Sequence, residues 1–201
     1  MERTLVIATF NRHKLEEISA ILPELPFALK PLSDFPGAEA PEEDGGTLLD
    51  NALKKALAAA RFTGLWAVAD DTGLEVDALG GAPGVRSARY AGEKASYREN
   101  NALLLSSLAG VPPGKRSARF VCVTALASAS GRVLTSRGVL EGAIATEASG
   151  SNGFGYDPLF LIGAGRVTLA SLSEGEKNSV SHRALALRGL LPELLRIFPG
   201  G

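Results

Sequence analysis

Two adjacent aspartates, Asp70 and Asp71, directly follow a short apolar run. Neighbouring carboxylates repel each other and add little to packing, so such a pair suits a hard cation or general-base chemistry. Glu42 and Glu43, in an acidic stretch upstream, could add oxygen ligands. The alternative is a turn at the end of a strand, in which residues 71–73 satisfy their own backbone.

A second group, Thr9, Asn11 and Lys14, stands where an apolar run changes into an amphipathic one. Backbone N–H groups at the start of a helix attract anions, and a hydroxyl, an amide and an ammonium would complete a phosphate site. The alternative is a helix whose N-cap is Asn11 and whose Lys14 is solvated.

A third group contains two aromatic residues next to glycine: Phe154, Gly155, Tyr156 and Asp157. Aromatic faces, a closely approachable backbone and a carboxylate acceptor together suit a planar base, which stacks and forms hydrogen bonds at its edges. The competing interpretation is that these aromatic residues fill a small core beside a turn.

The last group, Lys177 with Ser181, His182 and Arg183, is expected at the start of the final helix. By itself it could be a solvated helix start with Ser181 as N-cap. All four groups, however, are polar, lie at predicted strand or helix ends and suit a nucleotide, so their joint occurrence favours a nucleotide site.

Apolar periodicity predicts the elements that position these groups. Strands are expected over residues 4–9, 27–32, 65–69, 118–127, 132–144 and 159–162, and helices over 12–22, 47–64, 96–108 and from 181 onward. The helix over 47–64 is predicted to bury Leu49, Leu53, Ala56, Leu57 and Ala60. Residues 34–46 are expected to form a loop, and 118–144 a hairpin that turns at 130–131. This pattern predicts an α/β fold with an elongated mixed sheet, flanking helices and two lobes around a central nucleotide-binding cleft.

Composition excludes several classes. The 201 residues carry a formal net charge of −1, which argues against a nucleic acid partner, because duplex binding needs excess Lys and Arg. One cysteine cannot form an internal disulfide or a Cys-based zinc cluster, and this favours a cytoplasmic setting. No P-loop, H-E-x-x-H or G-x-S-x-G motif occurs. We find no signal peptide and no apolar run long enough for a membrane span.

Five motifs in order resemble the inosine triphosphate pyrophosphatase (Ham1-like) family, which acts on noncanonical purine nucleoside triphosphates. They are the Thr9-x-Asn11-x-x-Lys14 pattern and the segments 69–74, 80–90, 154–158 and 176–183. The resemblance covers residues 4–198, so we treat 1–201 as a single Ham1-like domain of two lobes. It implies a homodimer and a Mg²⁺-dependent hydrolase that cleaves between the α and β phosphates of ITP, dITP or XTP, clearing deaminated nucleotides from the pool.

The same resemblance implies a role for each matching residue. Asp71 would be the general base, with Asp70 beside it and Lys55 as a catalytic cation. Glu43 and Asp71 would hold the metal; Glu42 is equally acidic, and only motif register favours Glu43. The implied substrate-binding residues are Thr9, Asn11, Lys14, Thr72, Phe154, Gly155, Tyr156, Asp157, Lys177, His182 and Arg183.

Two other functions compete. A Maf-like pyrophosphatase of other modified nucleotides is disfavoured by segments 154–157 and 181–183. A nucleotide-binding sensor without turnover is disfavoured by the retained aspartate pair and lysines, since a pure binder gains little from carboxylates that face phosphates.

Overall fold

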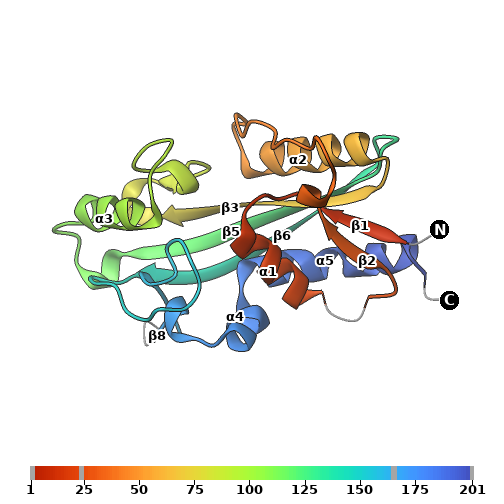
Figure 1. Ribbon diagram of the computed structural model, residues 1–201. Helices are drawn as coiled ribbons and strands as arrows, with labels where there is room; N and C mark the ends of the chain where they lie inside the picture. Colours follow the sequence, from red (N-terminus) through yellow and green to blue (C-terminus); the bar gives the residue numbers. More distant parts are fainter. Residues whose placement is uncertain (1–2, 23–24, 164–166, 200–201) are drawn as a thin grey trace. The chain divides into compact units, whose positions relative to one another are not determined.

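The computed structural model describes residues 3–22, 25–163 and 167–199. These residues form five α-helices and eight strands, and Figure 1 shows their arrangement along the chain. The strands are β1 (Thr4–Ile7), β2 (Ala28–Pro31), β3 (Trp66–Val76), β4 (Pro83–Gly84), β5 (Ser117–Ala127), β6 (Val133–Ile144), β7 (Phe160–Ile162) and β8 (Val167–Thr168). The helices are α1 (Arg12–Ile21), α2 (Leu48–Thr63), α3 (Tyr97–Ser107), α4 (Glu174–Val180) and α5 (His182–Ile197). None of these helices is long and apolar enough to cross a membrane.

The chain divides into two compact units. Unit 1 combines the chain up to Asp71 with Cys122–Gly138 and the chain from His182 onward, and unit 2 combines Thr72–Val121 with Val139–Ser181. Strands β3, β5 and β6 therefore contribute one part to each unit. The prediction of a mixed α/β fold is confirmed.

Unit 1 contains parallel strand pairs joined through helices. Its strands follow the order β2-β1-β3-β5-β6, and β1 runs parallel to both β2 and β3. Parallel neighbours need a crossover connection, which α1 provides between β1 and β2, and α2 between β2 and β3. Its apolar core brings together side chains from β1, α1, β3, β5 and α5, among them Leu5, Ile18, Val68, Leu126 and Leu187.

Unit 2 is built on antiparallel pairs. Here β4 pairs with β3, β7 with β6, and β8 with β7. A separate core contains Leu74 of β3, Leu104 of α3, Phe120 of β5 and Phe160 of β7. Helix α3 is thus fixed to the strands of its own unit by buried leucines, and it contacts residues 154–157, the aromatic loop.

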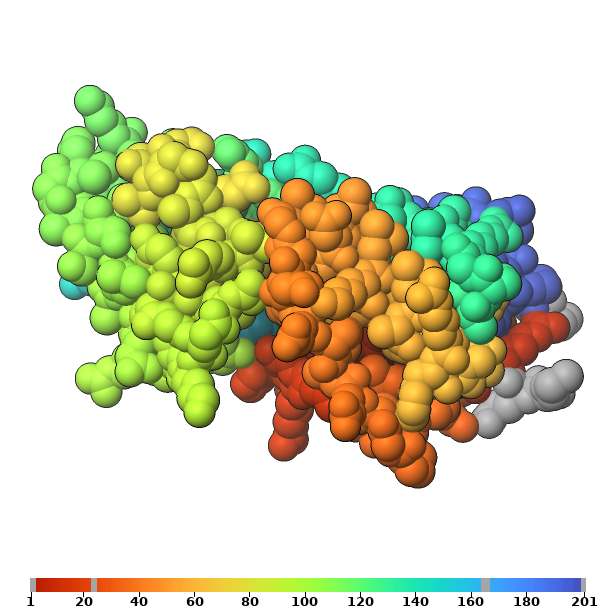
Figure 2. Space-filling view, turned by 90° about the horizontal axis from the view of Figure 1, so that it is seen from above, coloured from red at the N-terminus to blue at the C-terminus, as the bar shows by residue number. Residues whose placement is uncertain are grey.

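Helix α2 confirms its predicted caps and, of its predicted buried face, Ala56 and Ala60. Thr47 forms a capping box with Asp50, and Gly64 ends the helix in the left-handed conformation at φ 73°. The buried side chains are Leu48, Asn51, Ala52, Lys55, Ala56, Ala59 and Ala60, whereas Leu49 is 42% exposed. Figure 2 looks onto the outer side of this helix, drawn in orange. The three predicted leucines lie to one side of the buried face, because that face includes an asparagine and a lysine.

Other boundaries differ in informative ways. The hairpin of β5 and β6 and the helix α3 lie within a residue or two of their predicted ranges. Helix α4, a short helix with its own capping box at Ser173 and Glu176, was not predicted from the sequence. Most importantly, β3 does not end at Ala69 but continues through the aspartate pair to Val76.

Candidate active site

The entry to α1 brings Thr9, Asn11 and Lys14 together. The Asn11 side chain accepts hydrogen bonds from the backbone N–H groups of His13 and Lys14, so it is the N-cap. Thr9 Oγ1 accepts from the backbone N–H of Asn11 at 3.1 Å. Lys14 is not solvated, since its side chain is only 16% exposed and its Nζ lies 3.2 Å from Asp70 Oδ2. The three residues form one structured loop.

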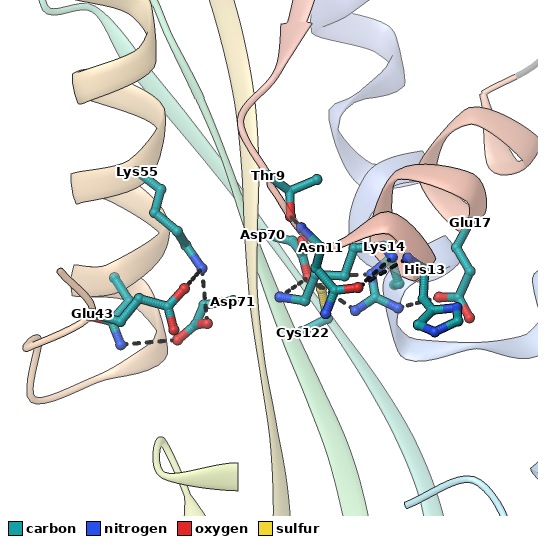
Figure 3. Close-up of polar contacts among 12 residues, drawn as sticks. Thr9, Asn11, His13, Lys14, Glu17, Glu43, Lys55, Asp70, Asp71 and Cys122 are labelled. Atoms are coloured by element: carbon teal, nitrogen blue, oxygen red, sulfur yellow. Dashed lines mark hydrogen bonds and ion pairs between the residues drawn. The ribbon is translucent and has the colours of Figure 1, made fainter. Parts of the chain in front are cut away.

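Asp70 and Asp71 lie inside β3, and this corrects the expectation that they stand at a strand tip. Successive side chains of a strand point to opposite faces. Figure 3 shows the consequence, with Asp70 on the side of α1 and Asp71 on the side of α2. The two carboxylates therefore belong to two separate polar clusters.

The Asp70 cluster is a buried network of opposite charges. Arg183 donates to Asp70 Oδ2 through Nη2 at 3.1 Å and to the Glu17 carboxylate through Nη1. Burial alone would raise the pKa of Asp70, but Lys14, Arg183 and Lys55 outweigh it and hold this pKa far below its usual range. Asp70 is consequently ionised at any physiological pH and is a poor proton acceptor.

The Asp71 cluster joins α2 to the acidic loop. Lys55 Nζ donates to Glu43 Oε1 at 2.7 Å and to Asp71 Oδ1 at 3.1 Å (Figure 3). Burial raises the pKa of Asp71, and the lowering effect of Lys55 and Lys14 does not fully offset it. Burial opposes the charge on Lys55, yet the carboxylates of Asp71, Asp70 and Glu43 outweigh it and raise the pKa of Lys55. A carboxylate with a raised pKa, next to a lysine that keeps its positive charge, suits general-base chemistry.

Asn51 belongs to this cluster and was missed by the sequence analysis. Its Nδ2 donates to Asp71 Oδ2 at 3.1 Å, while its Oδ1 accepts from the backbone N–H of Gly45 at 2.8 Å. A Cβ at Gly45 would lie 2.6 Å from that Oδ1, so glycine permits the close approach. Asn51 thereby ties the acidic loop to Asp71. Its position at helical spacing four residues before Lys55 was the available signal.

The Asp71 cluster also provides the residues that fit a divalent cation. Within the described part of the chain, no group of three or more His, Cys, Asp or Glu side chains is placed to hold a metal ion. Two carboxylates are present, Glu43 and Asp71, bridged by Lys55. Mg²⁺ is commonly bound by one or two carboxylates together with water and substrate phosphates, so this donor set fits. Glu43 is the acid that faces Lys55, whereas Glu42 is exposed.

In unit 2 the aromatic loop is held by an ion pair. Lys177 Nζ of α4 lies 2.5 Å from Asp157 Oδ2, and the same oxygen accepts from the backbone N–H of Phe154 at 2.9 Å. The Lys177 ammonium lies 5.0 Å from the centre of the Phe154 ring. The predicted association of Phe154, Asp157 and Lys177 is therefore present, although Lys177 lies on α4 and not on the last helix.

The neighbours of Phe154 have different environments. Gly155 has φ 64°, in the left-handed region that favours glycine. Tyr156 is buried in the core of unit 2, and its hydroxyl donates to the Ser87 carbonyl at 2.9 Å. Burial raises the pKa of Tyr156. Thr72 lies in β3, immediately after Asp71.

His182 and Arg183 open α5 in unit 1 and are both buried. The predicted cluster of Lys177, His182 and Arg183 is thus divided between the units, because Lys177 belongs to unit 2. Glu17 is the second residue that sequence reasoning missed. It is a buried carboxylate on the core face of α1, and the presence of an acid at such a position was the only signal.

Comparison with known proteins gives a consistent result. The Ham1 family model matches residues 5–193. A protein of Desulforamulus reducens named dITP/XTP pyrophosphatase is 51% identical over 194 residues, covering 96% of each chain. One of Geobacter sulfurreducens with the same name is 55% identical over 91% of this chain and 92% of its own. The structure of a HAM1 protein from Coxiella burnetii is 42% identical, with a TM-score of 0.87 over 96% of this chain and 99% of that one. The chain belongs to the Ham1 family.

Proposed function

We propose that this protein hydrolyses noncanonical purine nucleoside triphosphates, namely ITP, dITP and XTP, to the monophosphate and pyrophosphate in the presence of Mg²⁺. The observation that carries the proposal is that the two adjacent aspartates of β3 lie in different environments. Asp70 is locked as an ion, while Asp71, one residue later, combines a raised pKa with contacts to Lys55 and Asn51. The names of the relatives, dITP/XTP pyrophosphatase, support the substrate class.

Phosphate binding is assigned to side chains at the entry of α1. Asn11 already accepts from two N–H groups of the first helical turn, so the first turn is partly satisfied by the protein itself. The Thr9 hydroxyl, the Asn11 amide and the Lys14 ammonium would then contact the phosphates. The ion pair between the Lys14 ammonium and the Asp70 carboxylate fixes the position of the Lys14 side chain.

Glu43 and Asp71 would hold Mg²⁺. The cation would neutralise charge that develops on the phosphates and on the leaving pyrophosphate. Lys55 would add positive charge beside the leaving group. In the absence of substrate its ammonium links the two carboxylates, and that ion pair keeps the cluster assembled.

Asp71 would accept a proton from the attacking water. Lys55 and Asn51 each donate to one of its two carboxylate oxygens, so the carboxylate is held in a fixed orientation. Water attack at the α phosphate needs no covalent nucleophile. Asp70 would act only by fixing Lys14 and Arg183, which refines its predicted catalytic role.

The base is assigned first to the aromatic loop of unit 2. Phe154 would stack on it, Gly155 would let the backbone approach, and Asp157 and Lys177 would reach its edges. Tyr156 would hold the loop from the core, and Thr72 would continue the phosphate site from β3. His182 and Arg183 remain predicted base contacts; Arg183 is held by Asp70 and Glu17, so fixing the start of α5 is its first role.

Three further assignments belong to the proposal: a single Ham1-like domain over 1–201, a homodimer and a cytoplasmic setting. The two rival functions differ from the proposal in their products. A Maf-like enzyme would prefer other modified nucleotides, and a sensor would bind without turnover.

The test is a Mg²⁺ assay over ITP, XTP, GTP, ATP and pyrimidine triphosphates that separates pyrophosphate from orthophosphate release. ATP presents a 6-amino donor where ITP presents a 6-keto acceptor, and each buried mismatch costs about 1–3 kcal/mol. Two such contacts would favour ITP over ATP by roughly 100-fold in kcat/KM. GTP should fall between them. Orthophosphate as the sole product, or equal efficiency with ATP and ITP, would overturn the proposal.

A further inference from the structure

Helix α3 contacts the aromatic loop at two points that no role has yet explained. The Tyr97 and Phe154 rings lie 5.8 Å apart between centroids and are tilted by 39°. Asn101 donates from Nδ2 to the Gly155 carbonyl oxygen at 3.0 Å. Tyr97 and Asn101 are four residues apart and therefore share one face of the helix. Both contacts lie within unit 2.

We propose that Tyr97 and Asn101 are positioning residues for the base, which set the orientation of the Phe154 ring and of the Gly155 backbone in the proposed nucleotide site. The inference rests on the proposed function, because it concerns the loop of unit 2 that would receive the purine.

The ring contact gives Phe154 a second support. Lys177 approaches this ring with its ammonium, and Asp157 holds the Phe154 backbone N–H. Neither contact restrains the ring as a neighbouring aromatic plane does, since tilted rings at this separation attract each other in a preferred geometry. Tyr97 is 40% exposed, so its ring adds little to the core, and it contacts the loop through the Phe154 ring.

The amide contact acts on the adjacent residue. Gly155 has a left-handed backbone with no atom within 4 Å of a Cβ position, so side-chain packing does not determine the direction of its carbonyl. A donor from Asn101 does. Within the described residues, the Asn101 Oδ1 atom is buried and accepts no hydrogen bond.

The preceding asparagine provides a contrast. Asn100 uses both ends of its amide, because Oδ1 accepts from Ala91 N at 2.8 Å and Nδ2 donates to the Ala88 carbonyl at 3.0 Å. That pattern is typical of a residue that fixes its own surroundings. The Asn101 amide instead donates to the Gly155 carbonyl oxygen, so its specific role is to orient the aromatic loop.

The decisive variants are Y97L, which keeps an apolar side chain but removes the ring, and N101D, which keeps the shape but turns the donor into a second acceptor facing the Gly155 carbonyl. Binding of inosine monophosphate and of inorganic tripolyphosphate is measured by calorimetry for each variant and for the wild-type protein. The first probe carries the base and the second does not. R98A, an exposed substitution on the same helix, is the matched control.

Both variants should weaken monophosphate binding by about 3- to 10-fold, as expected for one aromatic contact or one hydrogen bond. Tripolyphosphate binding should stay within about twofold, the KM for ITP should rise more than kcat falls, and Y97F should restore monophosphate binding.

Unchanged monophosphate binding in Y97L would overturn the inference, and so would an equal loss for both probes. If N101D fails to fold, Y97L decides, because Tyr97 lies at the surface. A wild-type protein that binds monophosphate but releases no pyrophosphate from ITP would refute the proposed function and leave this inference intact.

Discussion

Replacing Asp71 by asparagine tests the centre of the mechanism, and the structure predicts two separable effects. Lys55 donates to Oδ1 and Asn51 donates to Oδ2. In D71N one of these oxygens becomes an NH₂ group, so a donor faces either the Lys55 ammonium or the Asn51 amide. A buried group left without its hydrogen bond costs about 1–3 kcal/mol. For a chain of this length, that lowers Tm by roughly 2–12 °C.

The second effect is on catalysis. D71N removes the proposed base and one carboxylate of the metal site, so we expect kcat for ITP to fall by about 100-fold or more, which corresponds to a barrier higher by about 2.7 kcal/mol or more. Pyrophosphate release at saturating ITP and Mg²⁺ measures the effect on catalysis, and thermal unfolding followed by calorimetry measures the change in Tm. The exposed variant D77N, at the residue that directly follows the same strand, controls for the loss of one negative charge.

The double variant N51D/D71N separates the two effects. It exchanges the amide and the carboxylate across one hydrogen bond, so the group at position 51 still accepts from Gly45 N and now accepts from position 71 as well, while Lys55 keeps an acceptor. Stability should return toward the wild-type value, but turnover should not. Activity of D71N within threefold of wild type, or recovery of turnover in the double variant, would show that a carboxylate at position 71 is not required.

The remaining predictions concern the cations and the buried network. K55A should raise the KM for ITP and lower kcat together, by about tenfold or more each, because Lys55 contacts both proposed metal ligands. If neither KM nor kcat changes, Lys55 has no role in the reaction. D70N should lower the free energy of unfolding at pH 7 by about 3–5 kcal/mol, since Lys14 loses its buried carboxylate partner and Arg183 keeps only Glu17 of its two. The pKa of Asp70 is depressed in the folded state, so its contribution is complete above the unfolded pKa of about 4 and is lost as the pH falls below it. Urea unfolding should therefore show a difference between D70N and wild type that shrinks below pH 4, and a difference independent of pH would contradict this account.

The sequence predicted those features that depend on local signals. Apolar periodicity located most of the elements, and Thr47 and Ser96 marked the starts of α2 and α3, where both side chains form capping boxes. The groups around Thr9 and Phe154 were recognised because their residue types are unusual beside glycine-rich or helix-entry segments. Each of these signals is contained within a few consecutive residues.

The features that the sequence did not predict depend on partners far away in the chain. Polar residues after an apolar run usually end a strand, so the aspartate pair was interpreted as the end of one. In the structure β3 continues because Asp70 is compensated by Lys14 and Arg183, and Asp71 by Lys55. Part of the face of α2 was misplaced for the same reason: burying a lysine costs free energy unless a carboxylate comes from elsewhere.

The spacing of the aspartate pair itself explains why two identical side chains can take different roles. Residues one apart in a strand face opposite sides, so Asp70 meets the side chains of α1 and α5, and Asp71 meets those of α2. Nearby cations outweigh burial at the first and hold its pKa far below the usual range, while for the second burial prevails over its cationic neighbours and raises the pKa. A spacing of two residues would place both carboxylates on one face, where each would raise the pKa of the other and compete for the same lysine. Adjacent placement in a continuous strand thus separates the ion-paired carboxylate of Asp70 from the carboxylate that we propose as the base.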